Sequence, residues 1–305
     1  MESAAANPPR VTVGLPVYNG ASFLCETLDS ILNQTFRDFE VVISDNASDD
    51  ETPSICQEYA QHDSRIRVIR HSRNRGSTAN FQLVLSEARG EYFIWVAADD
   101  LQEETLFETL FSVLQAHDEV VLVTSDILNV DRDGNPLSVD QLTSIRLDIA
   151  LADAAANTRV FFRSPAGNVF FAIYGMYRTA VLREVELNYR NMVTYLSGSE
   201  TPLLAQVSLR GRIVSVPGAL KLYRRREDSI YHQEAKGFRL RDQVLNKLNI
   251  SHALARIAAS SARSTPLKVA LLTTIIGDLA TMTCRHAVRL TAAKLSPRAA
   301  TDPAT

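Results

Sequence analysis

The chain has 305 residues, a length that suits one large α/β domain, with or without an appendage, better than two equal domains. Apolar residues make up 46% of it and charged residues 22%, the ordinary mixture of a globular protein, which argues against a disordered or fibrous chain. The net charge of -3 conceals an asymmetry, because residues 236–298 contain eleven Lys and Arg but only two acidic residues.

Apolar strands alternate with amphipathic helices over the first part of the chain. Strand patterns occupy residues 11–15, 39–43, 66–69, 92–97 and 120–124, and helical periodicity covers about 23–32, 52–61, 79–88 and 103–115. This alternation predicts right-handed crossovers and a mainly parallel sheet with helices on both faces. The expected fold class is therefore α/β with a Rossmann-like sheet.

The pattern changes after residue 130. Residues 131–136 carry the turn-forming side chains that are typical of a hairpin tip. We then expect a buried strand at 170–177, a helix at 201–209 that ends at Gly211, and a short strand at 212–216. After residue 233 the pattern is helical to about residue 295, with an interruption at 264–266.

The basic C-terminal segment has two interpretations. Its Lys and Arg side chains suit contact with anionic membrane lipid, and they equally suit the solvated face of packed helices. No run reaches the ~18 to 20 apolar residues of a membrane span, the first ten residues resemble no signal peptide, and the three cysteines are widely separated. These features predict a cytoplasmic protein, with peripheral contact at the inner face of the cell membrane as one option.

Three polar loops follow expected strands and contain Asp45, Asn74 and Asp99. Ligands of parallel α/β sheets bind beyond the carboxyl ends of the strands. We therefore expect these three loops to meet at one edge of the sheet.

Asp99 and Asp100 are adjacent carboxylates at the end of an apolar strand. They repel each other, and a hard cation such as Mg²⁺ or Mn²⁺ relieves this repulsion while it binds phosphate oxygens. The same pair also makes a good cap for the helix that begins near Glu103. The dipeptide alone leaves both interpretations open.

Four segments occur together in one order: Pro16-x-Tyr18-Asn19, residues 45–50, residues 74–76 and Asp99-Asp100. In type and spacing they resemble the inverting glycosyltransferase family 2, whose fold is GT-A. The resemblance is strong from about residue 11 to 130 and fainter to about 226. It implies a GT-A domain at 11–233 (nucleotide-sugar binding at 11–130, acceptor binding at 131–233). Outside that domain we see no family match, and we expect a disordered N-terminus at 1–10 and a helical basic extension at 234–305.

The resemblance implies a pocket for the base of a nucleotide diphosphate sugar. Pro16 and the ring of Tyr18 are expected to line it, with Asn19 among the donor-binding residues. Asp45 is expected to accept a hydrogen bond from the imide of uracil or thymine. Asp49 is expected to lie nearby as support.

The resemblance also implies contacts to the rest of the donor. Asn74 and Arg75 are placed among the donor-binding residues, with Arg75 directed at the diphosphate. Asp99 is expected to contact the ribose or the metal, and Asp100 to ligate the metal, Mn²⁺ or Mg²⁺. One departure is Ala97, because many members carry a further acidic residue at that position.

Glu200 stands just before the helix at 201–209, where the family places an acidic residue. A carboxylate at a helix N-terminus stays ionised, and it can accept the proton of an acceptor hydroxyl during a direct displacement that inverts the anomeric carbon. An ordinary helix-start glutamate, with Ser199 or Thr201 as the cap, is the alternative. The family more often has Asp here, which leaves the reach of the longer side chain open.

Tyr223-Arg224-Arg225-Arg226 resembles the family's Tyr-Arg-Arg-His segment, whose basic residues approach the diphosphate or order a closing loop. Arg224 and Arg225 are therefore counted among the donor-binding residues, although a charge run equally suits a solvated face. Gly175, in an aromatic stretch, resembles part of the acceptor wall, and these aromatic side chains equally suit a core.

Other nucleotide-binding classes lack their motifs here, since the chain has no glycine-rich pyrophosphorylase loop, no Gly-x-Gly-x-x-Gly and no P-loop. The predicted function is transfer of a sugar from a UDP-sugar or dTDP-sugar to a hydroxyl of a saccharide or lipid-linked saccharide, as in bacterial surface polysaccharides. The alternative is a nucleotide-sugar-binding protein without turnover. Nucleic acid is not an expected partner, and an oligomer is compatible with the sequence.

Overall fold

The computed structural model describes residues 7–137, 142–143, 167–185, 200–226, 240–261 and 267–277. In chain order its elements are β1 (Val11–Val17), α1 (Ala21–Leu32), β2 (Phe39–Asp45), α2 (Thr52–His62), β3 (Ile66–Arg70), α3 (Ser77–Ser86), β4 (Tyr92–Trp95), β5 (Leu101–Gln102), α4 (Leu106–Ala116), β6 (Val120–Val130), β7 (Leu142–Thr143), η2 (Gly167–Tyr174), β8 (Met176–Arg178), α6 (Thr179–Arg183), α7 (Thr201–Ser208), β9 (Arg212–Arg224) and α9 (Leu240–Ser261). Residues 267–277 form a further helix.

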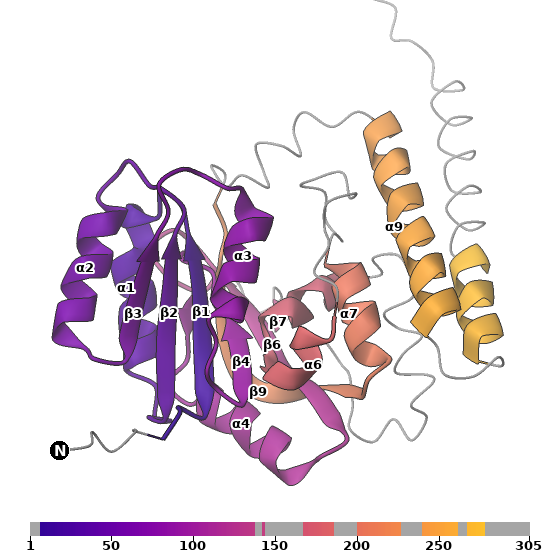
Figure 1. Cartoon of the computed structure of the whole chain (residues 1–305), viewed down its shortest axis with the longest axis horizontal. Coiled ribbons are helices and arrows are strands. Elements are labelled where there is room, and N and C mark those ends of the chain that lie inside the picture. The colour runs from indigo at the N-terminus through magenta and orange to yellow at the C-terminus, as the bar shows by residue number, and fades with distance from the viewer. Residues whose placement is uncertain are drawn as a thin grey trace, which may run out of the picture.

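A mixed sheet lies at the centre of the molecule (Figure 1), with the strand order β3-β2-β1-β4-β8-β6-β9-β5 and β7 beside β6. β1 pairs in parallel with β2 and β4, and β2 pairs in parallel with β3. β8 runs antiparallel between β4 and β6, and β6 pairs in parallel with β9. The predicted mainly parallel sheet is confirmed, with β8 joining its two parallel parts.

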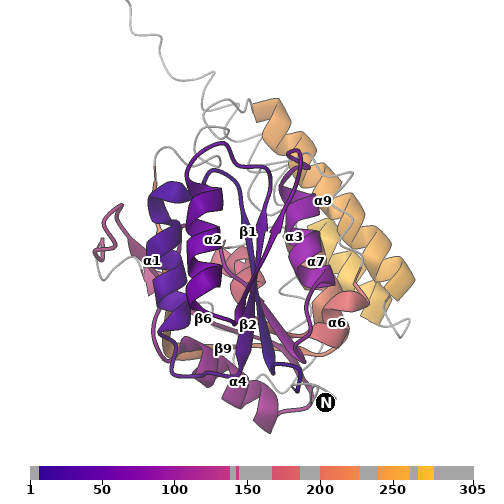
Figure 2. The same ribbon diagram turned by 60° about the vertical axis from the view of Figure 1, so that its left-hand side comes forward.

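Helices cover both faces of the sheet, and each face has its own hydrophobic cluster (Figure 2). On one face α1 and α4 contribute Leu28 and Phe107, with α2 beside them. On the other face α3 and α7 contribute Val84 and Leu204. The central strands β1 and β2 are mostly apolar and are buried at every residue, because neither face of the sheet meets water there.

The predicted strand at 170–177 is wrong over its first part. Residues 167–174 form the 3₁₀ helix η2, and only Met176–Arg178 is a strand. A Cβ atom at Gly175 would stand 2.4 Å from the backbone oxygen of Val123, so the chain passes tightly against β6 at this point. A short apolar run is buried either way, which is why periodicity alone did not separate a strand from a helix here.

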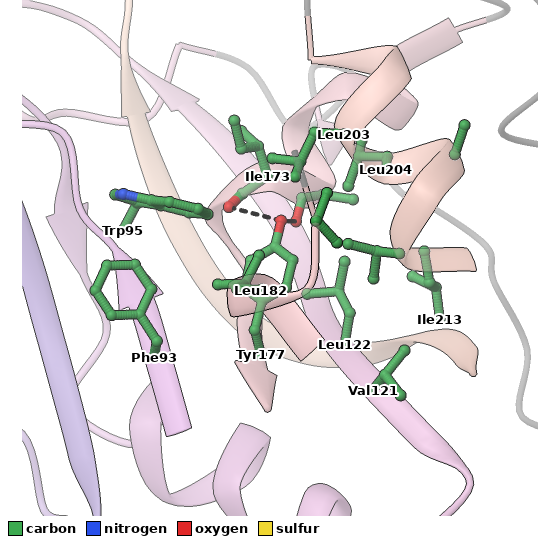
Figure 3. Close-up of a cluster of buried hydrophobic side chains, with 14 of the residues drawn as sticks. Phe93, Trp95, Val121, Leu122, Ile173, Tyr177, Leu182, Leu203, Leu204 and Ile213 are labelled. Carbon is green, nitrogen blue, oxygen red and sulfur yellow. Dashed lines mark hydrogen bonds between the residues drawn. The ribbon is translucent and has the colours of Figure 1, made fainter. Parts of the chain in front are cut away.

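Tyr177 holds this region together (Figure 3). Its ring lies edge-on to Trp95 with 5.5 Å between the centroids, and its hydroxyl donates to the backbone oxygens of Ala172 and Ile173 at 3.3 and 3.1 Å. The aromatic side chains near Gly175 therefore include core residues. This agrees with the interpretation of the stretch as part of the core, which the sequence left open beside that of an acceptor wall.

Two strands are longer than their sequence patterns indicate. β6 continues to Val130, and β9 continues through Pro217 and Gly218 to Arg224. Gly218 has a φ of 82°, and the register between β6 and β9 shifts across this stretch, so the turn-forming pair makes an irregularity inside one strand instead of ending it. The predicted turn at 131–136 is confirmed by a bond of 3.2 Å from Gly134 N to the Asp131 oxygen.

The described C-terminal helices pack against the domain. α9 buries Ile250, Leu254 and Ala258, and the helix at 267–277 buries Leu271 and Ile275, in the same cluster as α7. Figure 1 shows α9 beside α7, on the side away from α1 and α2. The predicted helical character is confirmed for these two segments, whereas residues 262–266 and 278–295 lie outside the described residues. Within the described ranges, no helix is both long and apolar enough to cross a bilayer.

Candidate active site

The loop after β1 is fixed against the loop after β2. Asn19 takes a left-handed conformation with a φ of 50°, which asparagine tolerates better than most residues. Its backbone N donates to Ser48 Oγ at 2.9 Å, and its Oδ1 accepts from the backbone N of Asp49 at 3.1 Å. Tyr18, just before it, has a side chain that is 44% exposed at this edge. Pro16 is buried within β1, opposite Ser44.

Asp45, the last residue of β2, is fully buried. Its Oδ1 accepts a hydrogen bond of 3.0 Å from the backbone N of Ser48. Its Oδ2 lies 3.2 Å from Nε of the exposed Arg70 but receives no hydrogen bond. Buried polar atoms nearly always have a partner, so this oxygen is a candidate acceptor for an N–H group of a ligand.

The loop after β3 is bound to the same edge by Asn46, a residue that the sequence analysis did not single out. Asn46 Nδ2 donates to Asn74 Oδ1 at 2.9 Å, and Asn46 Oδ1 accepts from the backbone N of Arg75 at 2.8 Å. Gly76, with a φ of 84°, donates its backbone N–H to Asn74 Oδ1 and leads into α3. The Arg75 side chain is left exposed.

The loop after β4 lies beside the start of α1. A Cβ atom at Gly20 would stand 3.5 Å from the Cβ atom of Ala98. Since residues 19–21 are themselves bound to the loop after β2, the carboxyl ends of β1, β2, β3 and β4 meet at one edge, as the sequence predicted.

Arg224 holds the loop after β4. Its Nε donates to the backbone oxygen of Asp99 at 2.9 Å, and its NH2 group pairs with Glu26 Oε2 on α1 at 2.6 Å. A third bond reaches the backbone oxygen of Arg132. The Arg224 side chain has no exposed surface, so a solvated face is the wrong interpretation for this residue. Asp99 Oδ2 pairs with the NH2 group of Arg226 at 2.7 Å.

Arg225, the next residue, points elsewhere. Its backbone N donates to the Val130 oxygen, its Nε donates to Asn129 Oδ1 at 2.9 Å, and it is exposed. The guanidinium groups of its two neighbours lie over the ring of Phe23 on α1 instead, with 4.6 and 5.0 Å to the ring centre. Arg225 is thus the member of this run that faces solvent.

Asp100 forms a buried ion pair with Lys221 on β9. The two residues are 1% and 2% exposed, and Asp100 Oδ2 lies 3.1 Å from Lys221 Nζ. Asp100 Oδ1 accepts from the backbone N of Arg224 at 3.2 Å, and Lys221 Nζ stands 3.7 Å from the ring centre of Tyr174. Burial raises the pKa of Asp100 to about 6 despite the attraction of Lys221.

Glu200 directly precedes α7, and its backbone oxygen accepts from the N of Leu204 at 3.1 Å. Burial, and then the carboxylates of Asp100 and Glu200, raise the pKa of Tyr174 well above its ordinary value. Asp100 is linked to this ring through Lys221, whose Nζ contacts both. The helix α7, which follows Glu200, packs against η2, which ends at Tyr174, and the role of Glu200 as a base stays a prediction.

A divalent cation does not fit the acidic pair as it is arranged. Lys221 contacts the carboxylate of Asp100, and Arg226 contacts that of Asp99. Ala97 supplies no third carboxylate, and in the part of the chain that the structure describes no three His, Cys, Asp or Glu side chains gather as a metal site. The expected ligand role of Asp99 and Asp100 remains a prediction that this geometry does not favour.

A central α/β sheet of this order, with polar loops gathered at the carboxyl ends of β1 to β4, defines a protein of the GT-A class. Residues 12–174 match the family model described as glycosyl transferase family 2. The chain belongs to this family.

Several named proteins are similar to it. Glycosyltransferase GlyG of Streptococcus pneumoniae is 33% identical over 126 residues, which are 41% of this chain and 42% of GlyG. An uncharacterized glycosyltransferase of Haemophilus influenzae is 25% identical over 75% of this chain and 70% of its own length. Putative glycosyltransferase EpsE of Bacillus subtilis is 33% identical, and the match covers 46% of its length. The chain thus spans less than half of the length of both GlyG and EpsE.

Solved structures agree on the fold. S. aureus TarS 1-349 in complex with UDP-GlcNAc gives a TM-score of 0.62 at 18% identity, over 88% of this chain and 71% of that one. The mannosyltransferase PcManGT from Pyrobaculum calidifontis, in complex with GDP-Man and Mn²⁺, gives a TM-score of 0.54 at 18% identity, over 95% of this chain and 81% of that one.

Proposed function

We propose that the protein is a glycosyltransferase that takes a sugar from a nucleotide diphosphate donor, with a UDP-sugar favoured over a dTDP-sugar. The observation that carries this is Asp45, whose buried Oδ2 receives no hydrogen bond and lies at the ligand edge of a family 2 fold. An imide N–H supplies the missing bond. The exposed ring of Tyr18, at the end of the neighbouring strand, offers an apolar surface to the base.

The transfer itself is a direct displacement. The acceptor hydroxyl oxygen forms a bond to the anomeric carbon while the bond from that carbon to the diphosphate breaks, and its electron pair leaves on the phosphate oxygen. Glu200 accepts the hydroxyl proton, and the anomeric configuration inverts. Arg75 is exposed on the loop after β3 and supplies positive charge for the leaving diphosphate.

The acceptor is a saccharide or a lipid-linked saccharide, an extension by analogy with the family setting. The basic segment after the packed helices supplies attraction to anionic lipid and so places the enzyme at a membrane surface. A nucleotide-sugar-binding protein without turnover is the competing function. Nothing in the geometry of Glu200, Asp45 and the acidic pair favours it.

A pair of measurements on wild type and Glu200→Gln tests the proposal. UDP is expected to raise the thermal midpoint of both proteins, because the proposed role of Glu200 is proton transfer and not binding of the base, whereas UDP release from a UDP-sugar panel is expected from wild type alone. Full activity of Glu200→Gln would remove Glu200 from the reaction. UDP binding without any release by wild type would support the binding protein, and no binding of any nucleotide would refute the donor site.

A further inference from the structure

The ammonium of Lys221 stands where a metal at Asp100 would have to bind. It lies 3.1 Å from Asp100 Oδ2, and the other oxygen of this carboxylate already accepts the N–H of Arg224. A divalent cation bound to the same oxygen, at the ~2.1 Å that Mg²⁺ requires, would stand within a few ångströms of the ammonium. Like charges at such a distance repel strongly in a buried site.

Lys221 cannot easily withdraw. Its backbone is paired with Gln102 on β5 and with Ile127 on β6, so β9 is held from both sides at this residue. Its side chain is 3% exposed, and this burial lowers the pKa of Lys221, whereas Asp100 and the ring of Tyr174, 3.7 Å from Nζ, favour the charged form. The lysine is therefore a fixed part of the site.

The negative charge of Asp99, the second carboxylate of the pair, is also balanced by a protein cation. Asp99 Oδ2 pairs with Arg226 at 2.7 Å, and the family's further acidic position is Ala97. Each acidic side chain of the pair thus has a protein cation in contact with it, which leaves no net negative charge to attract a metal. A hard divalent cation needs several anionic oxygens, and both carboxylates of this pair already contact a protein cation.

We propose that Lys221, together with Arg226, replaces a divalent metal as the counter-ion of the acidic pair, so that this family member binds its nucleotide diphosphate without a metal ion. Lys221 is a positioning residue: it keeps Asp100 in place to hold the backbone of Arg224. The proposal rests on the proposed donor site, but its metal-binding part is independent of any transfer.

The first test uses the wild-type chain and Mn²⁺ alone. Binding is measured by electron paramagnetic resonance as the loss of the signal of free Mn²⁺. We expect no binding at Mn²⁺ concentrations up to ~1 mM. UDP titrated by calorimetry is expected to show the same Kd, within about twofold, in EDTA and in Mn²⁺. Micromolar Mn²⁺ binding that Asp100→Asn abolishes, or UDP binding that requires Mn²⁺, would overturn the proposal.

The second test removes the charge of Lys221. Lys221→Met keeps the length of the side chain and releases Asp100, so Mn²⁺ binding and a Mn²⁺-dependent rise in the thermal midpoint are expected to appear. The double variant Lys221→Met/Asp100→Asn is neutral at both positions, and it is expected to fold but to show neither Mn²⁺ binding nor a Mn²⁺-dependent rise in the thermal midpoint. Lys268→Met, on the last described helix, is the control for the loss of a lysine elsewhere in the protein. A folded Lys221→Met protein that binds no Mn²⁺ would refute the role of Lys221.

The outcomes separate the two proposals. If Lys221→Met does not fold, the wild-type titrations still decide, since they need no variant. If UDP binds under no condition, the proposed donor site is wrong, while the Mn²⁺ titrations of wild type and variants still test the counter-ion.

Discussion

Among single residues, Asp45 is the one on which recognition of the base is expected to depend. Asp45→Asn keeps an oxygen for the backbone N of Ser48 but replaces Oδ2, which pairs with Arg70 and accepts no hydrogen bond, with an N–H donor. Two donors then face each other when uracil binds, and a buried unmatched hydrogen-bond site costs about 1–3 kcal/mol. We expect UDP to bind roughly 10- to 100-fold more weakly, measured by calorimetry.

Asp49→Asn is the matched control for Asp45. Asp49 is exposed in the same loop, and only its backbone N is bound, to Asn19 Oδ1. Because Asp49 is expected only to support the base pocket, its substitution is expected to weaken UDP binding less than Asp45→Asn does. Equal losses in the two variants would show that the loop, and not the buried carboxylate, recognises the base.

Asp63 gives a pH dependence of stability. Hydrogen bonds from Arg65, at 2.7 Å from NH2 and 2.9 Å from the backbone N, lower the pKa of Asp63 below its ordinary value of 3.8. Since the folded pKa is the lower one, the stabilisation is complete above the unfolded value and is lost as the pH falls through the folded value. Asp63→Asn is expected to lower the unfolding free energy by roughly 1–2 kcal/mol near neutral pH and by less in acid. Urea denaturation at both pH values measures this, and a constant difference would contradict it.

The sequence predicts the position of a residue well where that position depends on the order of neighbouring strands and helices in the chain. Asp45 ends one strand and Asp99 follows another, and parallel strands bring their carboxyl ends together, so the place of both residues at one edge of the sheet could be predicted. Lys221 could not, because its contact with Asp100 depends on β9 continuing past Gly218 to pair with β5. A lysine inside the apolar run at 219–223 was the available signal.

At the scale of elements, α9 is stabilised by one buried face. Leu254 is 1% exposed within the cluster shared with α7, and Leu248 on the same helix is 44% exposed. Leu254→Ala is expected to lower the unfolding free energy by about 2–5 kcal/mol, because it removes buried methyl groups and leaves a cavity. Leu248→Ala is expected to change it by less than about 0.5 kcal/mol. Chemical denaturation compares them, and equal effects would show that α9 does not pack as described.

The elements also show where pattern reasoning ends. The strands β1 to β3 and the helices α1 and α2 follow the sequence closely, since each meets its neighbours within a few dozen residues. η2 and the second half of β9 depend on contacts with β6, which is distant in the chain. Tertiary contacts decide the conformation of such segments.

At the scale of the whole molecule, Arg224 joins parts of the chain that are far apart. Its guanidinium contacts α1 through Glu26 and the loop after β4 through Asp99, and these partners are 198 and 125 residues away in sequence. The acidic pair is therefore positioned by β9 and α1 together. No window of sequence contains that arrangement.

The same scale decides how the basic C-terminal segment is tested. α9 and the helix at 267–277 belong to the hydrophobic core, so deleting them would expose Leu204 and its neighbours. Truncation after Gly277 leaves this core intact and removes Arg285, Arg289, Lys294 and Arg298.

If this segment attaches the enzyme to anionic lipid, each basic residue near the surface contributes about 1 kcal/mol, and its loss is expected to abolish sedimentation with phosphatidylserine vesicles. The thermal midpoint and UDP affinity of the truncated protein are expected to stay at the wild-type values, because no described core residue is lost. Wild-type binding should also weaken as salt is raised, since the attraction is screened over about 10 Å at 0.1 M salt. Unchanged sedimentation after truncation would show that Arg285, Arg289, Lys294 and Arg298 do not attach the protein to lipid.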